Sequence, residues 1–213
     1  MSRASSIHHP VFARIYTRLS KAVEANGVGA HRDELLAGVS GRVVEVGAGN
    51  GANFVHYPAT VTEVVAVEPE PYLRERAKEA ARSAPVKVTV VDGTADRLPL
   101  EMGSCDVGVA SLVLCSVADQ AAALAELHRV IRPGGELRFY EHIRSQQPRL
   151  ARLQQRADIV WPFLGGGCHA SRLTDEAIKT AGFVVEHTRY FNFRTCFIEV
   201  LVAPRVIGIA RRP

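Results

Sequence analysis

The chain has 213 residues, of which 47% are hydrophobic and 23% charged, and 26 Lys and Arg against 22 Asp and Glu give a formal charge of +4. These fractions exclude a disordered, collagen-like or coiled-coil protein, and the length suits one domain. The N-terminal sequence lacks the apolar core of a signal peptide, and no run of 18 apolar residues occurs. We therefore expect a cytoplasmic protein with reduced thiols and no transmembrane segment.

Secondary-structure signals follow a regular order along the chain. Residues 10–37 are predicted to be helical, with a break near 26–29. From Gly41 onward, short β-branched runs alternate with helices, and Pro133-Gly134-Gly135 is predicted to end one of these helices. The strand-like runs are 43–46, 63–67, 86–91, 106–110 and 136–141. This alternation predicts an α/β fold with a doubly wound, mostly parallel sheet.

The last third of the chain has a different pattern. Residues 144–160 are predicted to be helical, and a second helix is expected to begin at a capping Thr174 and to end at Gly182. Apolar runs follow at 183–188, 197–202 and 206–210. Strands this close together, with no helix between them, predict an antiparallel edge on the sheet. We expect one domain, 1–213, with three parts: a helical N-terminal lid (1–40), a ligand-binding core (41–143) and acceptor-side helices with C-terminal strands (144–213).

A glycine-rich loop follows the first predicted strand, in the sequence VVEVGAGNGAN of residues 43–53. Such a loop, at the carboxyl end of a strand, is the usual ligand crevice of a doubly wound sheet. Gly47, Gly49 and Ala52 satisfy the dinucleotide fingerprint, and Glu68 lies where a ribose ligand is expected. A carboxylate at Glu45 is unfavourable beside a pyrophosphate but suits a cationic ligand, S-adenosylmethionine (SAM). An NAD-dependent oxidoreductase remains the alternative.

Five segments, in this order, resemble the motifs of the class I SAM-dependent methyltransferases. They are VVEVGAGNGANF, AVEPEP, VVDGTADRLPL, SCDVGVASLVLCSVAD and LHRVIRPGGELRFYEH, and they span 41–143. The resemblance implies a Rossmann-like seven-stranded sheet and SAM as the cofactor. It also implies cofactor contacts from Glu45, Gly47, Ala48, Gly49, Asn53, Glu68, Pro69, Thr94, Ala95, Ser111 and Leu112.

A closer likeness indicates which class of molecule accepts the methyl group. The segments NFVHYP, LVLCSV, RPGGELRFYEH, Trp161-Pro162, Gly167-Cys168 and the SRLT of 171–174 resemble the mammalian methyltransferase-like proteins that methylate alkyl thiols. Those relatives carry an N-terminal hydrophobic anchor that this sequence lacks, so we expect at most peripheral membrane contact. Bacterial phospholipid and quinone methyltransferases share many of these motifs, so those acceptors stay open alongside a small thiol.

A binding protein without enzymatic activity is the third hypothesis. Residues 144–213 contain 11 basic and 5 acidic residues, and Arg149, Arg152 and Arg156 share one helix face. That face could bind nucleic acid or an anionic membrane, but a solvated helix face is the commoner explanation of such a pattern. We therefore expect no nucleic-acid partner.

Two residues are catalytic candidates. His142 follows the fifth predicted strand on its ligand side and is either a general base or a hydrogen-bonded structural histidine. Tyr16, one helical turn after Phe12, is either part of a lid over the cofactor or part of a packed face. Trp161 and Phe163 could wall an apolar acceptor pocket, and Trp161 and His169 are further candidate helpers.

The four cysteines show no metal-binding spacing. They lie at positions 105, 115, 168 and 196, without a CxxC or CxxH motif, so we expect no metal site. Cys115 is predicted to be a small buried hydrophobe, and Cys168 is a similar case.

Overall fold

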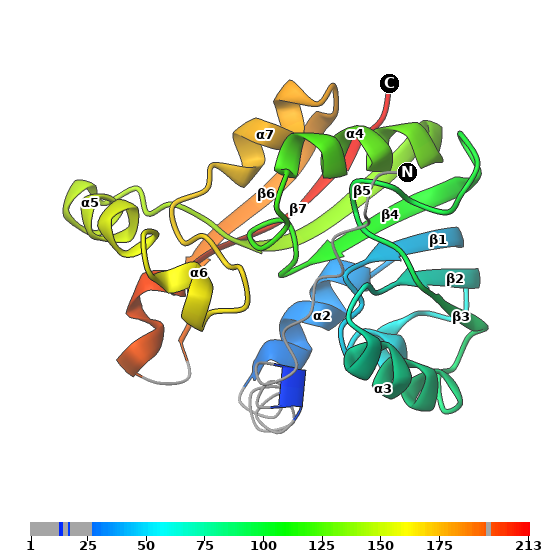
Figure 1. Cartoon of the computed structure of the whole chain (residues 1–213). Helices are drawn as coiled ribbons and strands as arrows, with labels where there is room; N and C mark the ends of the chain where they lie inside the picture. Colours follow the sequence, from blue (N-terminus) through cyan, green and yellow to red (C-terminus); the bar gives the residue numbers. More distant parts are fainter. Residues whose placement is uncertain (1–12, 15–16, 18–26, 195–196) are drawn as a thin grey trace, which may run out of the picture.

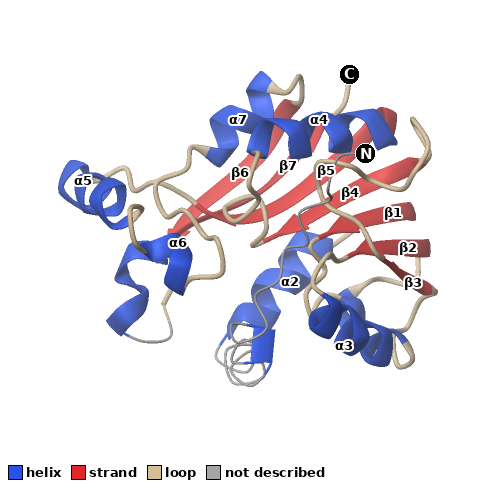
Figure 2. Cartoon of the chain, in the orientation of Figure 1, coloured by secondary structure: helices blue, strands red, loops and turns tan. Residues whose placement is uncertain are grey.

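The chain forms a seven-stranded sheet with helices on both faces (Figures 1 and 2). The computed structural model describes residues 13–14, 17, 27–194 and 197–213. The strand order is β3-β2-β1-β4-β5-β7-β6, and β7 runs antiparallel to both of its neighbours. The strands are β1 (Gly41–Val46), β2 (Val61–Val67), β3 (Val88–Val91), β4 (Cys105–Ser111), β5 (Ile131–His142), β6 (Val184–Asn192) and β7 (Pro204–Arg211). The predicted doubly wound α/β fold with an antiparallel C-terminal edge is confirmed.

Helices cover the two faces of the sheet separately (Figure 1). α4 and α7 lie on one face, and α2 and α3 lie on the other, while α5 and α6 lie beyond one end of the strands. The helices are α2 (Gly29–Leu36), α3 (Pro71–Ala81), α4 (Gln120–Val130), α5 (Pro148–Ala157), α6 (Trp161–Leu164) and α7 (Thr174–Thr180). Short 3-10 turns occupy η2 (Phe54–His56) and η3 (Phe197–Val202). None of the described helices is long and apolar enough to cross a membrane.

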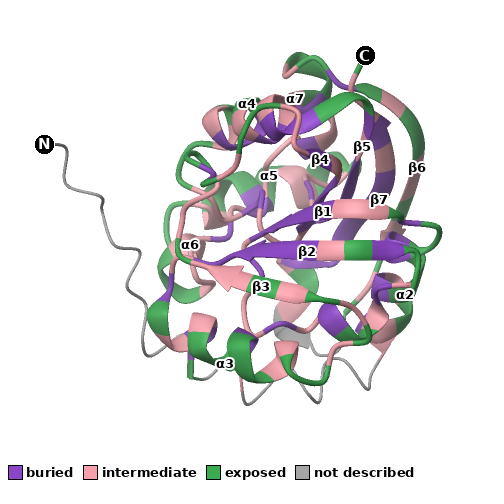
Figure 3. Cartoon of the chain, turned by 90° about the vertical axis from the view of Figure 1, so that its right-hand side faces the viewer, coloured by how far each residue is buried: buried purple, intermediate pink, exposed green. Residues whose placement is uncertain are grey.

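Burial explains why the central strands read as continuous apolar runs. All four residues of β1 from Val43 to Val46 are buried, because the strand lies between helices on both faces. The edge strand β6 instead contains only exposed and half-buried residues. Figure 3 shows this contrast, with buried residues along the middle strands and exposed ones on the outer helix surfaces. The sheet therefore separates two hydrophobic layers, one under α4 and α7 and one under α2 and α3.

The predicted turn at Pro133-Gly134-Gly135 is in fact the beginning of β5. α4 ends at Val130 and the strand starts at once with Ile131. Gly135 permits this because a Cβ there would lie 2.6 Å from the carbonyl oxygen of Asp106 on the neighbouring strand. The prediction of a helix end was correct, but the glycines serve close strand pairing.

Three expectations for the last third were wrong in detail. Of the predicted helical stretch 144–160, only α5 (Pro148–Ala157) is helical, and α6 begins after that stretch, at Trp161. Thr174 does not cap α7 through its side chain; instead its hydroxyl accepts a hydrogen bond from Gln120 Nε2 at 3.1 Å. The apolar run 197–202 forms the turn η3 instead of a strand, and the carbonyl of Leu201 accepts a hydrogen bond from Gln154.

Candidate active site

A cavity of about 260 Å³ lies at the carboxyl ends of β1, β2, β4 and β5. This is where ligands bind in doubly wound sheets. Eight of the predicted site residues line it: Gly47, Gly49, Glu68, Pro69, Ala95, Ser111, Leu112 and His142. The glycine loop borders one end of the cavity, while Cys115 and Cys168 join His142 at another part of its wall. The tertiary structure thus places most of the candidates around one space.

Gly47 requires the absence of a side chain for two reasons. Its φ is +61°, in the left-handed region that favours glycine, and a Cβ would lie 2.3 Å from Cγ2 of Val113. The turn then directs the N–H of Gly49 at the end of the second strand, where it donates to Glu68 Oε2 at 2.7 Å. The loop and the acidic residue therefore form one structural unit.

Glu68 is held in place by backbone groups and still faces the cavity. Its second oxygen, Oε1, accepts the N–H of Glu70 at 2.9 Å. Burial raises the pKa of this carboxyl, although the two backbone hydrogen bonds oppose the change. Each oxygen keeps a further lone pair, so the group can accept hydrogen bonds from two neighbouring hydroxyls of a ligand.

Glu45 is buried beneath the glycine loop and is not part of the cavity lining. Its oxygens accept hydrogen bonds from the Tyr57 hydroxyl at 2.7 Å and from the Asn53 amide at 2.9 Å. Burial raises the pKa of Glu45 to about 7. Asn53 and Ala48 also lie outside the lining. For these three residues, direct ligand contact stays a prediction, and their observed contacts support the loop from behind.

Arg32 of α2 is a site residue that the sequence analysis missed. Its buried guanidinium donates to Asn53 Oδ1 at 2.5 Å and to the hydroxyl of Ser111 at 3.1 Å. It therefore joins the glycine loop to the end of β4, and it lowers the pKa of Glu45 against the larger effect of burial. A charged residue in an eight-residue helix gives no sequence signal of this role.

The adenine-side candidates divide into two positions. Ala95 lines the cavity, whereas Thr94 does not and forms an isolated backbone bridge with Arg97. That bridge turns the chain after β3 so that Ala95 faces the space. Contact of Thr94 with a ligand stays a prediction.

The loop after β4 is held by Glu141. The sequence analysis did not predict this supporting role. Its fully buried carboxylate accepts the N–H groups of Val113, Leu114 and Cys115 at 2.8–3.1 Å. Leu112, just before them, has a φ of 57°, an unusual value for a residue with a side chain. Three convergent hydrogen bonds stabilise this strained turn, which faces the cavity.

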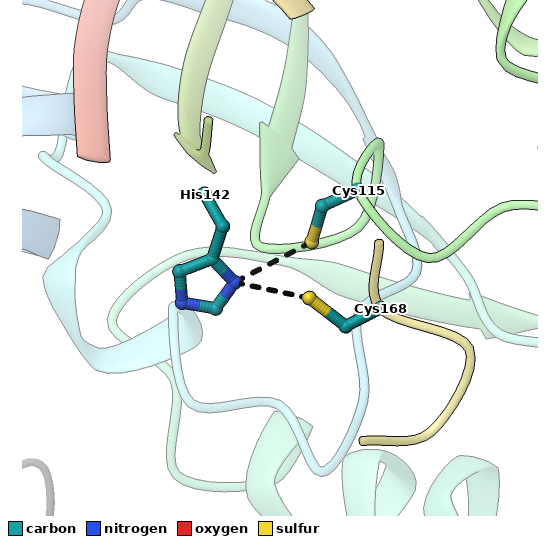
Figure 4. A group of neighbouring side chains, drawn as sticks. All are labelled: Cys115, His142 and Cys168. Carbon is teal, nitrogen blue, oxygen red and sulfur yellow. Dashed lines mark hydrogen bonds between the residues drawn. The ribbon is translucent and has the colours of Figure 1, made fainter. Parts of the chain in front are cut away.

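Cys115, His142 and Cys168 gather at the cavity wall (Figure 4). Nδ1 of His142 lies 3.6 Å from Sγ of Cys115 and 3.4 Å from Sγ of Cys168, and both sulfurs point at this nitrogen. The hydrogen bond between the two cysteines raises the pKa of Cys115 and lowers that of Cys168, and His142 lowers the latter further. The prediction that both cysteines are buried holds, but neither is only a small hydrophobe.

The remaining candidates lie elsewhere. Tyr16 and Phe12 are outside the described residues, although Ala13 is buried and lines the cavity. Phe163 is 87% exposed and does not wall the cavity. Trp161 is partly buried and packs against the cluster that contains Cys115 and Cys168. His169 lies 3.9 Å from Asp158, away from the lining.

Known proteins share both the sequence motifs and this fold. Residues 44–139 match the model of the family described as "Methyltransferase domain". Thiol S-methyltransferase TMT1B of Homo sapiens is 36% identical over 154 residues, which cover 70% of this chain and 63% of that protein. The chain therefore spans just under two thirds of that relative. Thiol S-methyltransferase TMT1A of Homo sapiens is 35% identical over 181 residues, covering 82% and 73%.

Structural comparison agrees on the fold. A crystal structure described as a putative methyltransferase from Bacillus halodurans superposes with a TM-score of 0.72 at 16% identity, covering 86% of this chain and 98% of that one. The match to the human thiol S-methyltransferase extends over 181 residues. It favours SAM over a nicotinamide cofactor as the ligand of the glycine loop, and therefore a methyltransferase over an NAD-dependent oxidoreductase. By sequence, fold and the arrangement of its glycine loop and Glu68, the chain belongs to the SAM-dependent methyltransferase family.

Proposed function

We propose that this chain transfers a methyl group from SAM to a small thiol. One observation carries the proposal: a single cavity is bordered by the Glu68 and glycine-loop unit and also by Cys115, His142 and Cys168. The first set suits a cofactor with ribose hydroxyls. The second lies within reach of an acceptor that shares the cavity. The names of the two human relatives favour a thiol as that acceptor.

The residues of the first set fit the cofactor. Glu68 offers one oxygen to each of two ribose hydroxyls, and its orientation is set by the N–H groups of Gly49 and Glu70. When ionised, the buried carboxyl groups of Glu45 and Glu68 provide negative potential for a ligand with ammonium and sulfonium groups. When bound, SAM supplies an activated methyl group that an in-line nucleophile displaces.

A thiol needs little help from the protein to act as a nucleophile. Its ordinary pKa of ~8.5 leaves part of it ionised near neutral pH. The protein therefore has to position the sulfur more than it has to deprotonate it. Positioning can lower the activation barrier by several kcal/mol. His142 lies at the cavity wall and, as predicted from the sequence, is the candidate catalytic side chain for this step. We propose this role for it.

The three parts expected from the sequence correspond to three roles in this proposal. We propose that residues 41–143 bind the cofactor and that 144–213 complete the acceptor side. For 1–40, the lid role and the part of Tyr16 in it stay predictions from the sequence. The acceptor role of 144–213 is supported by three residues that line the cavity, Gly165, Gly166 and Cys168. The lid role of 1–40 is supported by buried Ala13, which also lines it. We also propose that the chain acts in the cytoplasm, because the cysteines of the described residues are free thiols, as in reducing compartments.

A lipid-like acceptor, such as a phospholipid or a quinone, is the second candidate. Ile159, Phe163 and Leu164, at and just before α6, expose 71–87% of their surface, and Gly165 directly after them lines the cavity. An apolar rim beside the opening favours an acceptor delivered from an apolar phase, with peripheral membrane contact.

Labelled SAM tests the proposal directly. The purified chain is incubated with labelled SAM and a panel of alkyl thiols, phenols, amines, quinols and phospholipid vesicles. We expect alkyl thiols to be labelled fastest. Transfer only to quinols or phospholipids would favour the second candidate, and the absence of transfer to thiols would contradict the first.

A further inference from the structure

Three potential metal ligands converge at the cavity wall from distant parts of the sequence. Cys115 lies in the loop after β4, His142 ends β5, and Cys168 follows α6. Their donor atoms all lie within 4.8 Å of one another. Figure 4 shows the two sulfurs directed at the same ring nitrogen of His142. A thiol-rich set with one imidazole is the donor chemistry that zinc prefers.

The two nitrogen–sulfur distances match those of a tetrahedral zinc site. With Zn–S of about 2.3 Å and Zn–N of about 2.0 Å, a tetrahedral angle sets the distance between a nitrogen and a sulfur ligand at about 3.5 Å. The observed distances from His142 Nδ1 are 3.6 Å to Cys115 Sγ and 3.4 Å to Cys168 Sγ. Both distances therefore suit two ligands of one tetrahedral metal ion, and they also suit hydrogen bonds.

The backbone around the three residues is held from several sides. The N–H of His169 donates to the carbonyl of Cys115 at 2.8 Å, which ties one cysteine loop to the other. Arg172 donates to the carbonyls of Leu114 and Val117 at 2.5 and 2.7 Å. Gly167 adds to the close approach, because a Cβ there would lie 2.9 Å from the carbonyl oxygen of Ser116. Such supports set ligand positions in advance, as metal sites require.

We propose that Cys115, His142 and Cys168 bind a zinc ion as three protein ligands, with the fourth coordination position open to the cavity. All three side chains line that cavity, so the open position faces the same space as Glu68. Three protein ligands and one exchangeable position are the pattern of catalytic zinc, whereas structural zinc has four protein ligands.

The open position gives the metal a use in the proposed function. A thiol that coordinates there releases its proton to solvent, and its sulfur remains a thiolate near neutral pH. That sulfur then provides the electron pair of the new S–CH₃ bond, while the bond from the methyl carbon to the sulfonium sulfur breaks and S-adenosylhomocysteine leaves. This use rests on the proposed function, but zinc binding itself does not.

Cobalt titration of the full chain tests the metal site. Co²⁺ replaces zinc and shows thiolate-to-metal charge-transfer absorption only when sulfur is a ligand. We expect one Co²⁺ per chain with that absorption, displaced by Zn²⁺. Cys115→Ser and Cys168→Ser should lose most of it, and binding should weaken by more than the roughly 10–100-fold that loss of a supporting contact costs. Cys105→Ser is the matched control, because Cys105 is buried but lies outside the cluster and should leave the absorption intact.

A second measurement needs no variant. Zn²⁺ should protect Cys115 and Cys168 of the wild-type chain from alkylation, as read by mass spectrometry, and should leave the reactivity of Cys105 unchanged. Equal alkylation with and without Zn²⁺, or equal cobalt spectra in the wild type and both cysteine variants, would overturn the site.

Failure of the metal site and failure of the proposed function give different results. Thiol methylation by a chain that binds neither Co²⁺ nor Zn²⁺ would overturn the zinc site and leave the proposed function standing. Metal binding with the expected spectra, together with SAM stabilisation but no thiol methylation, would support the zinc site and remove its proposed use. A cobalt spectrum that changes when an alkyl thiol is added, together with methylation of that thiol, would support both.

Discussion

The two ends of the cavity are built in different ways. At the end that we propose for SAM, called the cofactor end, the glycine loop and Glu68 follow neighbouring strands, and the N–H of Gly49 donates to the carboxylate of Glu68. At the end that we propose for the thiol, called the acceptor end, Cys115, His142 and Cys168 come from three separate segments and meet through side chains. The first end depends on backbone conformation, while the second depends on the chemistry of a few side chains. Substitutions at the two ends should therefore affect different measurements.

The largest effect is expected at Gly47. Gly47→Ala should abolish SAM binding and destabilise the chain, because an alanine at φ +61° costs roughly 1–2 kcal/mol and its Cβ would also collide with Val113. Gly38→Ala is the matched control, since Gly38 has a φ of +72° with nothing within 4 Å of a Cβ. Urea unfolding and SAM titration measure both effects. Equal destabilisation in the two variants would show that the contact with Val113 is unimportant.

Glu68 should carry most of the affinity for the cofactor. Glu68→Ala is expected to remove two hydrogen bonds to a charged acceptor and to weaken SAM binding by roughly 2–3 kcal/mol, or about 30–150-fold. Isothermal titration calorimetry measures the change, and the rise in Tm caused by SAM should largely disappear. Glu75→Gln, on the exposed surface of α3, should bind SAM like the wild type. An unchanged affinity in Glu68→Ala would show that the ribose assignment is wrong.

A substitution of Cys168 should affect the acceptor end of the cavity without affecting the cofactor end. Cys168→Ser is expected to lower kcat/KM for an alkyl thiol by about 10–100-fold, because the acceptor loses its positioning. The Kd for SAM should stay within about twofold, since Glu68 and the glycine loop are untouched. Steady-state kinetics and calorimetry on one preparation give both values. A parallel loss of SAM affinity would mean that the two ends are not independent.

The smallest expected effect is the pH dependence contributed by Glu45. Burial raises its folded-state pKa to about 7, above an ordinary value of 4.5, so the folded chain binds its proton more tightly than the unfolded chain does. The stabilising contribution is complete below pH 4.5 and is lost as the pH rises through 7. We therefore expect the free energy of unfolding to decrease over that window. Glu45→Gln should flatten it in urea unfolding series, and an equal slope in both proteins would refute this origin.

Several outcomes show how far local sequence patterns determine the cofactor end. The strand, glycine turn and acidic residue lie within residues 43–68, and the parallel pairing of β1 with β2 brings them together. Their geometry follows from backbone rules that act over a few residues. For this reason Gly47, Gly49 and Glu68 could be predicted to share a site, and all of them line the cavity.

Only the tertiary structure placed the other contributors. Arg32 reaches Asn53 and Ser111 because α2 packs against the sheet, and no motif marks it. Glu141 supports the loop of Cys115 because β4 and β5 are paired neighbours. Sequence spacing excluded a metal motif for the cysteines, yet folding brings Cys115 and Cys168 to one imidazole.

The sequence by itself determined the fold class, the parallel strands with the motifs that follow them, and the glycine loop. Each of these features depends on periodicity and turn chemistry over short stretches of sequence. The start of β5 at Ile131, the turn at η3 and the ligand-like cluster of Cys115, His142 and Cys168 were decided by tertiary structure. They depend on which segments become neighbours in space. That choice is made by packing across the whole sheet and leaves no regular spacing along the chain.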